Sequence, residues 1–242
     1  ERVIIEKLQE YYSQLSKNIC IIPARRGSKR LPRKNVLLLK GKPLIAYTID
    51  AAVQCKLFDK VCVSTEDEEI ANLALRYSAE VPYRRPQHLA TDQATVVAVC
   101  LDMLSYFEKR GLFFESLCCL YPTAVLRNSE DIINAYKIFK KGFFSVIAVA
   151  NYFFPPHQAL VLNVDGSVRF FWEDVGRKRS QELPEFFVDN GSTYWSDVER
   201  FKLEKTFYSS KTGIYKMPKL RSVDIDTEED LQLLHKIIGV DS

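Results

Sequence analysis

The sequence predicts an α/β fold in which helices cover a mostly parallel sheet. Continuous apolar runs, typical of strands buried on both faces, alternate along the chain with segments that have helical spacing. The rhythm breaks once, near Asn151, where the pattern of a hairpin replaces it. A length of 242 residues allows one large domain or two small ones, and 47% hydrophobic residues is an ordinary globular content.

The expected elements follow one another regularly after residue 18. Apolar runs predict strands at residues 18–24, 60–64, 80–83, 116–121 and 143–150. Helical spacing predicts helices at residues 43–55, 65–77, 94–110, 128–141 and 227–239. Thr65 and Glu68 have the spacing of a capping box, and Ser129 and Thr227 are expected to start the last two helices.

Residues 151–198 are expected to form an insertion that projects from the main sheet. Asp165 and Gly166 lie between two apolar runs, which is a hairpin signal. Such an apolar hairpin often packs on a partner subunit, and a flap over its own domain explains the pattern equally well. The α/β pattern then resumes at residues 206–218.

Residues 1–18 form a candidate amphipathic helix ahead of the expected domain, which covers residues 19–242. Ile4 and Leu8 fall on one apolar stripe of this helix. Two heptads are too few for a coiled coil, so we expect the helix to pack on its own domain. The chain begins at Glu1 rather than Met, which leaves upstream residues and a cleaved targeting segment open.

The charge balance and the cysteines exclude several classes of protein. A net charge of +3 with 27% charged residues argues against a dedicated nucleic-acid binder. None of the six cysteines lies in a CxxC or Cys/His pattern, so we expect no zinc site and a reducing, cytoplasmic setting. No apolar run approaches the ~20 residues of a membrane span, so no membrane partner is expected either.

Residues 21–35 join an apolar run to a strongly basic loop. This basic loop holds six cations within ten residues: Arg25, Arg26, Lys29, Arg30, Arg33 and Lys34. Gly27 and Ser28 let backbone amides turn inward, and the cations can neutralise phosphate oxygens. The loop lacks the Walker A and GxGxxG patterns, and a solvated basic turn is the alternative. Because ligands bind at the carboxyl ends of strands in open parallel sheets, its place after the first strand favours phosphate.

A second group of polar residues lies at residues 222–227. Asp224 and Asp226 are two apart in an extended segment, so both carboxylates project from the same face. Neighbouring carboxylates repel each other unless a cation lies between them, and oxygen ligands suit Mg²⁺. The alternative is that one carboxylate caps the helix that starts at Thr227. A basic loop and a Mg²⁺ site together favour phosphoryl or nucleotidyl transfer.

Seven segments, in order along the chain, resemble motifs of the nonulosonic acid cytidylyltransferases, the CMP-sialic acid synthetase family. They are IIPARRGSKRLPRKN, GKPLIAYTIDAA, VSTEDEEIA, RRPQHLATD, YPTAVLR, RSQELPEFFVDNGSTYW and SVDIDTEEDL. The resemblance implies a Rossmann-like fold with an inserted hairpin region through which two copies form a homodimer. It also implies that CMP from CTP is joined to a nine-carbon 2-keto sugar acid, with release of pyrophosphate and with Mg²⁺ as cofactor.

The resemblance implies roles for individual residues as well. Arg25 and Lys34 match the residues that bind the triphosphate, and Asp224 and Asp226 match the Mg²⁺ ligands, so these four are the candidate catalytic residues. Further candidates for nucleotide binding are Gly27, Ser28, Asn35, Arg85, Asp92 and Thr123. Candidates for sugar binding, partly across a dimer interface, are Gln158, Arg179, Gln181, Asn190, Tyr194 and Trp195.

Three departures from the family pattern bear on the acceptor. Tyr121 replaces a glutamine common in sialic acid members, Glu66 replaces an aspartate, and Val188 and Asp189 stand where an arginine–proline pair often precedes Asn-Gly. Asp189 should repel a sugar carboxylate that faced it, so that acid is held in another way or the acceptor differs. Tyr121 and the segment around residues 179–195 resemble the pseudaminic acid branch, which favours pseudaminic acid over legionaminic or N-acetylneuraminic acid.

Three other functions stay open from the sequence. One is a sugar nucleotidyltransferase with another acceptor, such as 3-deoxy-manno-octulosonate. Another is a nucleotide-binding regulatory or scaffolding protein without turnover, against which the intact pair of Asp224 and Asp226 argues. The third, RNA binding by the basic loop, would depend steeply on salt, and the low net charge argues against it.

Overall fold

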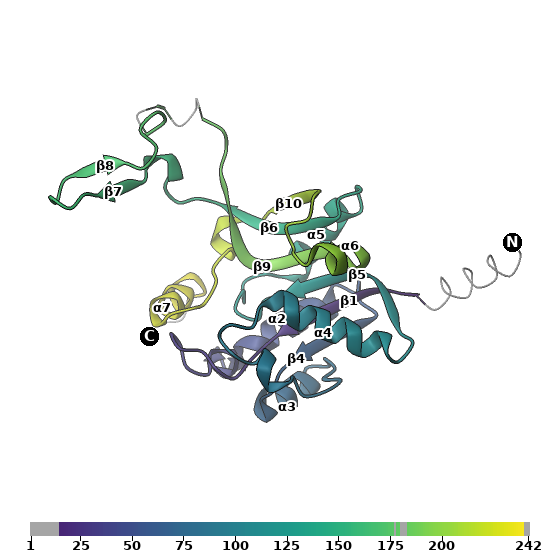
Figure 1. Cartoon of the computed structure of the whole chain (residues 1–242). Helices are drawn as coiled ribbons and strands as arrows, with labels where there is room; N and C mark the ends of the chain where they lie inside the picture. The colour runs from purple at the N-terminus through teal and green to yellow at the C-terminus, as the bar shows by residue number, and fades with distance from the viewer. Residues whose placement is uncertain (1–14, 177, 180–182, 240–242) are drawn as a thin grey trace, which may run out of the picture.

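A computed structural model of the chain describes residues 15–176, 178–179 and 183–239. Six strands form one central sheet (Figure 1): β1 Leu15–Pro23, β4 Lys60–Ser64, β5 Phe113–Leu120, β6 Ser145–Asn151, β9 Phe187–Asp197 and β10 Thr212–Lys216. Their order in space is β10-β6-β9-β5-β1-β4. β1 runs parallel to β4 and β5, and β6 runs parallel to β10, whereas β9 is antiparallel to both of its neighbours. The prediction of a mostly parallel sheet is confirmed.

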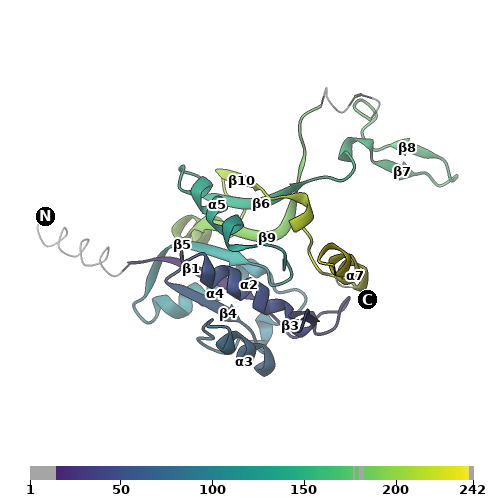
Figure 2. The same cartoon turned by 180° about the vertical axis from the view of Figure 1, so that it is seen from behind.

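Helices cover both faces of this sheet, as Figure 1 and the view from behind in Figure 2 show. They are α2 Leu44–Gln54, α3 Glu68–Arg76, α4 Val96–Glu108, α5 Ser129–Phe139 and α6 Val198–Glu204. α2, α3 and α5 pack on one face over Cys20 and Ile22, whereas α4 and α6 pack on the other face over Ile19 and Ile21. Successive residues of β1 therefore enter opposite cores, which explains why this strand is apolar throughout.

A third, smaller core connects the last helix, α7 Glu228–Ile237, to the loop after β1. Leu234 of α7 packs there with Ile225, Leu31, Leu39 and Leu44. The short hairpin of β2 Leu38–Leu39 and β3 Lys42–Pro43 contributes Leu39 to this core. The packing holds the basic loop and the aspartate pair on the same side of the molecule.

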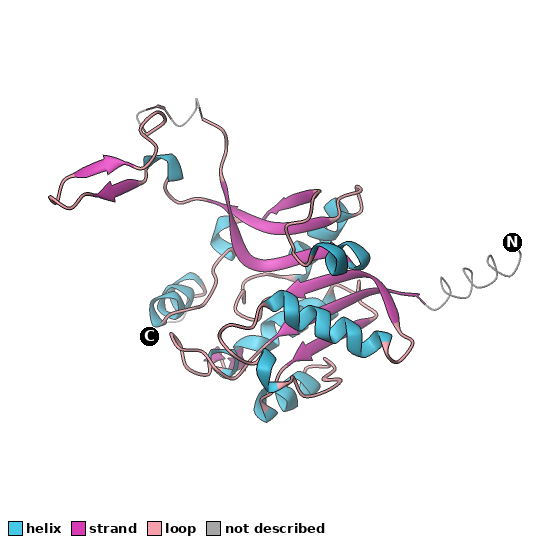
Figure 3. Ribbon diagram, in the orientation of Figure 1, coloured by secondary structure: helices cyan, strands magenta, loops and turns pink. Residues whose placement is uncertain are grey.

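A segment that includes residues 152–176 and 183–186, called the arm below, projects away from the sheet (Figure 3). The arm carries the hairpin of β7 Leu160–Leu162 and β8 Val168–Phe170. The predicted turn at Asp165 and Gly166 is confirmed, and Gly166 has a φ of +82°, which favours glycine.

The insertion expected at residues 151–198 is too long. Residues 187–197 form β9, which lies inside the sheet between β5 and β6. A strand that returns from an insertion carries no local sign of the strands it will pair with, so its pattern alone did not place it in the sheet.

The structure also corrects two local expectations and confirms a third. Asp67, not Thr65, caps α3, because the Asp67 carboxylate accepts the N–H of Ile70. Residues 80–83 form no strand, and only Glu80 makes an isolated bridge. α7 is capped by Thr227 as predicted, in a capping box.

Residues 1–14 of the expected N-terminal helix lie outside the described residues, and residues 15–18 already belong to β1. The helix therefore stays a prediction for the part before Leu15. All six cysteines are buried and unpaired. Within the described ranges, no helix has both the length and the apolar character needed to cross a membrane.

Candidate active site

The carboxyl ends of β1 and β5 meet at a cavity of about 440 Å³. The basic loop after β1 lines it together with the residues that follow β5 and with Asp226 from the segment before α7. Most residues predicted to bind the nucleotide line this first cavity, namely Arg25, Gly27, Ser28, Lys34, Asn35, Asp92 and Thr123. The topology thus brings together residues that are as far apart in the sequence as Arg30 and Asp226, 196 positions, at the edge where open parallel sheets bind ligands.

Cations outnumber carboxylates in the lining of the first cavity, by four to two. Lys34 Nζ donates to an Asp226 oxygen at 2.7 Å and to the Ile225 carbonyl at 3.2 Å, and Arg30 also pairs with Asp226. Lys34 is mostly buried, so its ammonium is held in place rather than free in solvent. A surplus of fixed positive charge around a cavity suits a polyphosphate.

Asp92 holds two further cations of the basic loop. Arg25 and Lys29 each lie 2.6 Å from one of its carboxylate oxygens. Hydrogen bonds from Lys29 and Arg25 hold the pKa of Asp92 below its ordinary value. Asp92 therefore orients these two side chains while all three remain partly exposed to solvent.

Asn35 and Glu66 fix the backbone of the basic loop. Asn35 Nδ2 donates to the Arg25 carbonyl at 2.9 Å, and a Glu66 oxygen accepts the N–H of Arg26 at 2.7 Å. Asn35 Oδ1 is buried and has no hydrogen-bond partner within the described part of the chain. This oxygen is available to a hydroxyl or amino group of a bound nucleotide, since buried acceptors are normally satisfied.

Asp224 and Asp226 lie on either side of Ile225 in the segment before α7. Ile225 is fully buried in the core around α7. Asp226 lines the first cavity, whereas Asp224 lines a second cavity of about 520 Å³. The aspartate pair therefore lies at the border between two cavities.

The environment of Asp224 disfavours its charged form. Burial raises the pKa of Asp224 above its ordinary value, a hydrogen bond with Thr123 opposes the shift, and the charge of Asp226 adds to it. Asp224 Oδ1 is buried without a partner among the described residues. A Cβ atom at Gly191, where φ is +64°, would lie 3.1 Å from Oδ2, so glycine leaves that oxygen its space.

The second cavity lies between β9 and the base of the arm. Two residues predicted to bind the sugar, Asn190 and Tyr194, line it together with Asp189. One oxygen of Asp189 accepts the Tyr194 hydroxyl at 2.8 Å and the Gly191 N–H at 2.9 Å, and the other accepts the Tyr208 hydroxyl. Burial and the charge of Asp189 raise the pKa of Tyr194, so this hydroxyl stays protonated and donates.

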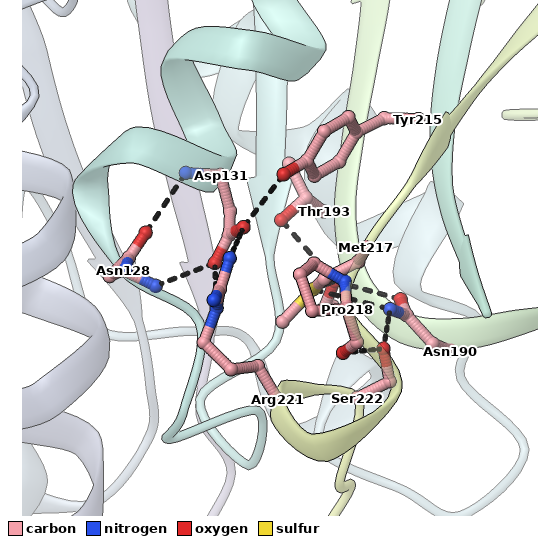
Figure 4. A network of polar contacts seen from close by, with 10 residues as sticks. Asn128, Asp131, Asn190, Thr193, Tyr215, Met217, Pro218, Arg221 and Ser222 are labelled. Atoms are coloured by element: carbon pink, nitrogen blue, oxygen red, sulfur yellow. Dashed lines mark hydrogen bonds and ion pairs between the residues drawn. The ribbon is translucent and has the colours of Figure 1, made fainter.

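A polar network fixes the loop that connects β10 to the aspartate pair (Figure 4). Asp131, buried at the start of α5, accepts two hydrogen bonds from Arg221 at 2.7 and 3.1 Å and one from Tyr215 at 2.8 Å. Asn190 of β9 donates to Ser222 Oγ at 3.1 Å. The loop is thereby tied to a helix on one side and to a strand of the sheet on the other.

Comparison with known families decides which one this site belongs to. The model of the cytidylyltransferase family matches residues 19–239, nearly the whole chain. The chain belongs to this family. The family predicted from the seven motifs is confirmed.

Individual proteins that are similar to this cytidylyltransferase support the same family. A pseudaminic acid cytidylyltransferase of Campylobacter jejuni is 36% identical over 225 residues, which cover 91% of this chain and 97% of that protein. A CMP-N,N'-diacetyllegionaminic acid synthase of Legionella pneumophila is 36% identical over 227 residues, which cover 91% and 95%. A solved CMP:2-keto-3-deoxy-manno-octonic acid synthetase complexed with CTP has a TM-score of 0.64 at 17% identity, covering 93% of this chain and 99% of that one. This last likeness is one of fold.

Trp195 does not line either cavity of this cytidylyltransferase, and the expectation that it binds the sugar is corrected. Its indole is fully buried, donates to the Ile132 carbonyl at 3.3 Å and stacks on Phe58. Neighbouring residues of a strand face opposite sides of the sheet. Because Tyr194 faces the second cavity, Trp195 enters the core beneath α5.

Four other predicted site residues either line neither cavity or lie outside the described part of the chain. Arg85 lines neither cavity, because its buried guanidinium donates to the hydroxyl and the carbonyl of Ser64. Gln158 and Arg179 are exposed and line neither cavity. Gln181 lies outside the described residues.

The aspartate pair of this cytidylyltransferase offers carboxylate oxygens, which are the ligands that Mg²⁺ prefers. No group of three or more His, Cys, Asp or Glu side chains suited to a metal occurs among the described residues. Asp230, four residues after Asp226, uses its Oδ2 to accept the N–H groups of Asp226 and Thr227. Two carboxylates with one unpartnered buried oxygen suit a cation that completes its shell with phosphate and water.

The sequence did not single out Lys219 or Tyr208. Lys219 lines the second cavity from the loop before the aspartate pair, and Tyr208 reaches Asp189 from the segment before β10. Neither residue lies in a motif. Only the order of the strands in the sheet brings Lys219 and Tyr208 to the second cavity, so no local sequence pattern could predict their position.

Proposed function

We propose that this protein joins CMP from CTP to a nine-carbon 2-keto sugar acid and releases pyrophosphate. The position of Asp224 and Asp226 at the border of two cavities carries this proposal. The cationic cavity on the Asp226 side has the charge for a triphosphate, and the cavity on the Asp224 side has the volume of a small-molecule site. The names of the two relatives support CMP transfer to such an acid.

Pseudaminic acid is the acceptor we favour. The relative named for pseudaminic acid shares 36% of its residues with this chain over nearly the full length of both. Tyr121, which lines the first cavity, also matches the residue pattern of the pseudaminic acid branch. The legionaminic acid relative is equally similar, so these two acids must be compared directly.

The reaction is an in-line substitution at the α-phosphorus of CTP. The C2 oxygen of the sugar acid forms a bond to this phosphorus while the bond to the oxygen that bridges the α- and β-phosphates breaks. Pyrophosphate leaves with the electron pair, and the hydroxyl proton passes to solvent. Lys34 and Arg25, which form ion pairs with Asp226 and Asp92, would balance the charge on the phosphates. Asp224 and Asp226 would hold Mg²⁺, which when bound neutralises phosphate charge and lowers the pKa of a nearby hydroxyl.

The proposal includes a homodimer formed through the arm. Large apolar side chains are exposed on it: Phe153, Phe154, Leu160, Leu162, Val164, Val168, Phe171 and Trp172. Monomeric proteins rarely expose so many apolar residues on one projection, so a second copy is the natural cover. Gln158 and Arg179 would then contribute to the sugar site of the second copy, because they line neither cavity of their own chain.

A reducing, cytoplasmic location is also part of the proposal. Six buried, unpaired cysteines support it, because disulfides form where the surroundings are oxidising. Labelling of accessible thiols before and after unfolding, in extracts made without reductant, would test whether the cysteines are free in the cell.

A substrate panel tests the choice of acceptor. Pyrophosphate release from CTP should be fastest with pseudaminic acid, slower with legionaminic and N-acetylneuraminic acids, and slowest with 3-deoxy-manno-octulosonate. Faster release with the octulosonate would overturn the assignment to nonulosonic acids. Tight CTP binding without release for any acid would instead support a non-catalytic protein.

A further inference from the structure

The second cavity contains a single cationic side chain among the described residues that line it. This is Lys219, and the two carboxylates of the same lining belong to Asp189 and Asp224. A sugar acid that enters the cavity brings a negative charge of its own. That charge needs a cation, since both carboxylates of the lining repel it.

The ammonium group of Lys219 has donors to spare. Its Nζ donates to the Tyr152 carbonyl at 3.1 Å and lies 3.6 Å from the centre of the Phe153 ring. No carboxylate of the described residues lies within ion-pair distance of it. An ammonium group has three N–H donors, so two remain for a ligand.

The carboxylate of Asp189 could accept a hydrogen bond from a substrate only by giving up a donor that it already has. Its oxygens already accept Tyr194, Gly191 and Tyr208. Burial raises the pKa of Tyr208 to about 12, so this phenol remains a donor to Asp189 at neutral pH. Asp189 therefore orients Tyr194, and its oxygens are already occupied by donors of the chain itself.

The loop that carries Lys219 is anchored on both sides of it. Met217 donates its N–H to the Val149 carbonyl at 2.9 Å, and Arg221 pairs with the buried Asp131 (Figure 4). Ser222 is bound by Asn190, which also lines the second cavity. The backbone of Lys219 is thus fixed beside the cavity, as a binding residue requires.

We propose that Lys219 binds the carboxylate of the acceptor sugar acid. The inference rests on the proposed function and names the residue that recognises the acid. In a 2-keto sugar acid the carboxylate and the attacking hydroxyl are attached to the same carbon. A carboxylate bound by Lys219 therefore also sets the direction in which this hydroxyl faces Asp224, which lines the same cavity.

Steady-state kinetics of Lys219→Met test the proposal. The KM for the sugar acid should rise about 10- to 100-fold, as expected for the loss of a hydrogen bond to a charged group, while the KM for CTP stays the same. Lys219→Arg, which keeps the charge, should restore most of the affinity. Lys211→Met is the matched control, because Lys211 is exposed and lines neither cavity.

An analogue of the acceptor separates carboxylate recognition from other contacts. The C1 carboxamide of the sugar acid should inhibit the wild type only weakly, and it should inhibit Lys219→Met to the same extent. The carboxamide lacks the negative charge that Lys219 is proposed to bind. An unchanged KM for the acid in Lys219→Met, or an equal loss of affinity for acid and carboxamide, would overturn the proposal. Failure of the wild type to bind or use any 2-keto sugar acid, measured by calorimetry and by turnover, would contradict the proposed function and the role of Lys219 together.

Discussion

Asp224 combines two properties that a residue kept only for stability would not have. One of its oxygens is buried without a partner among the described residues, and burial raises its pKa. An ionised Asp224 therefore destabilises the fold at neutral pH, and the fold becomes more stable as the pH falls through the raised pKa. Such a local loss of folding stability is typical of a functional site, and a bound cation would offset it.

Replacing Asp224 by asparagine should stabilise the free protein and abolish turnover. The variant removes a buried charge, which should raise the free energy of unfolding by about 1 kcal/mol at pH 7. Thermal unfolding with and without Mg²⁺ checks this. Mg²⁺ and CTP together should raise the Tm of the wild type but not of the variant, while Glu229→Gln, at an exposed position in α7, should behave like the wild type. A variant that is less stable without Mg²⁺ would contradict this reading of the site.

Lys34 and Arg26 belong to the same basic loop and should differ sharply in importance. Lys34 lines the first cavity and is held by Asp226, whereas Arg26 is largely exposed and lies outside that cavity. Lys34→Met should lower kcat/KM for CTP by about 100-fold or more, as for other groups that stabilise developing charge. Arg26→Met should change it only a few-fold. Similar losses in both variants would mean that the loop acts through its overall charge.

Local patterns predicted the residues of the first cavity well and those of the second less well. Lys34 and Asp226 lie in compact segments whose chemistry is visible in the sequence, and the structure joins them by a hydrogen bond in the first cavity. Lys219 and the burial of Trp195 depend on which strands are neighbours and on which face each residue occupies. No short window of sequence contains that information.

At the scale of whole elements, the start of α7 connects a helix cap to the proposed Mg²⁺ site. Thr227 and Asp230 form a capping box directly after Asp226, and Asp230 also accepts the N–H of Asp226. The cap therefore fixes the backbone that carries the aspartate pair.

Thr227→Ala should weaken both stability and the use of Mg²⁺. Loss of the cap should lower the free energy of unfolding by about 1 kcal/mol. The Mg²⁺ concentration for half-maximal rate should rise, because Asp226 loses its fixed orientation. Thr227→Ser, which keeps the capping hydroxyl, should restore both quantities in denaturant and Mg²⁺ titrations. A stability loss with an unchanged Mg²⁺ requirement would separate the cap from the site.

β9 shows where element-level prediction reached its limit. The parallel strands were recognised because each is a continuous apolar run followed by a helix. Residues 187–197 follow the arm, and the first part of this range alternates between half-buried and exposed positions. Their place between β5 and β6 is settled by long-range pairing, which the sequence pattern does not report.

The whole molecule presents an apolar arm beside a largely polar domain, and this arrangement predicts a dimer. The mass in solution should be twice the 27.9 kDa of one chain. Leu162→Glu places a charge among the exposed apolar residues of the arm and should yield monomers with a higher KM for the sugar acid. Light scattering coupled to size exclusion measures the mass. Leu203→Glu, at an equally exposed site on α6, is the control and should remain dimeric.

The protein is proposed to transfer CMP from CTP to a sugar acid at the border of the two cavities. A reaction in which each component is omitted in turn tests this transfer most directly. Pyrophosphate release and the appearance of a CMP-linked sugar acid would be followed together, by a coupled assay and by phosphorus NMR. Both should appear in equal amounts only when CTP, Mg²⁺ and pseudaminic acid are all present. Pyrophosphate release without the acid, or no CMP-linked product with all three, would contradict the account.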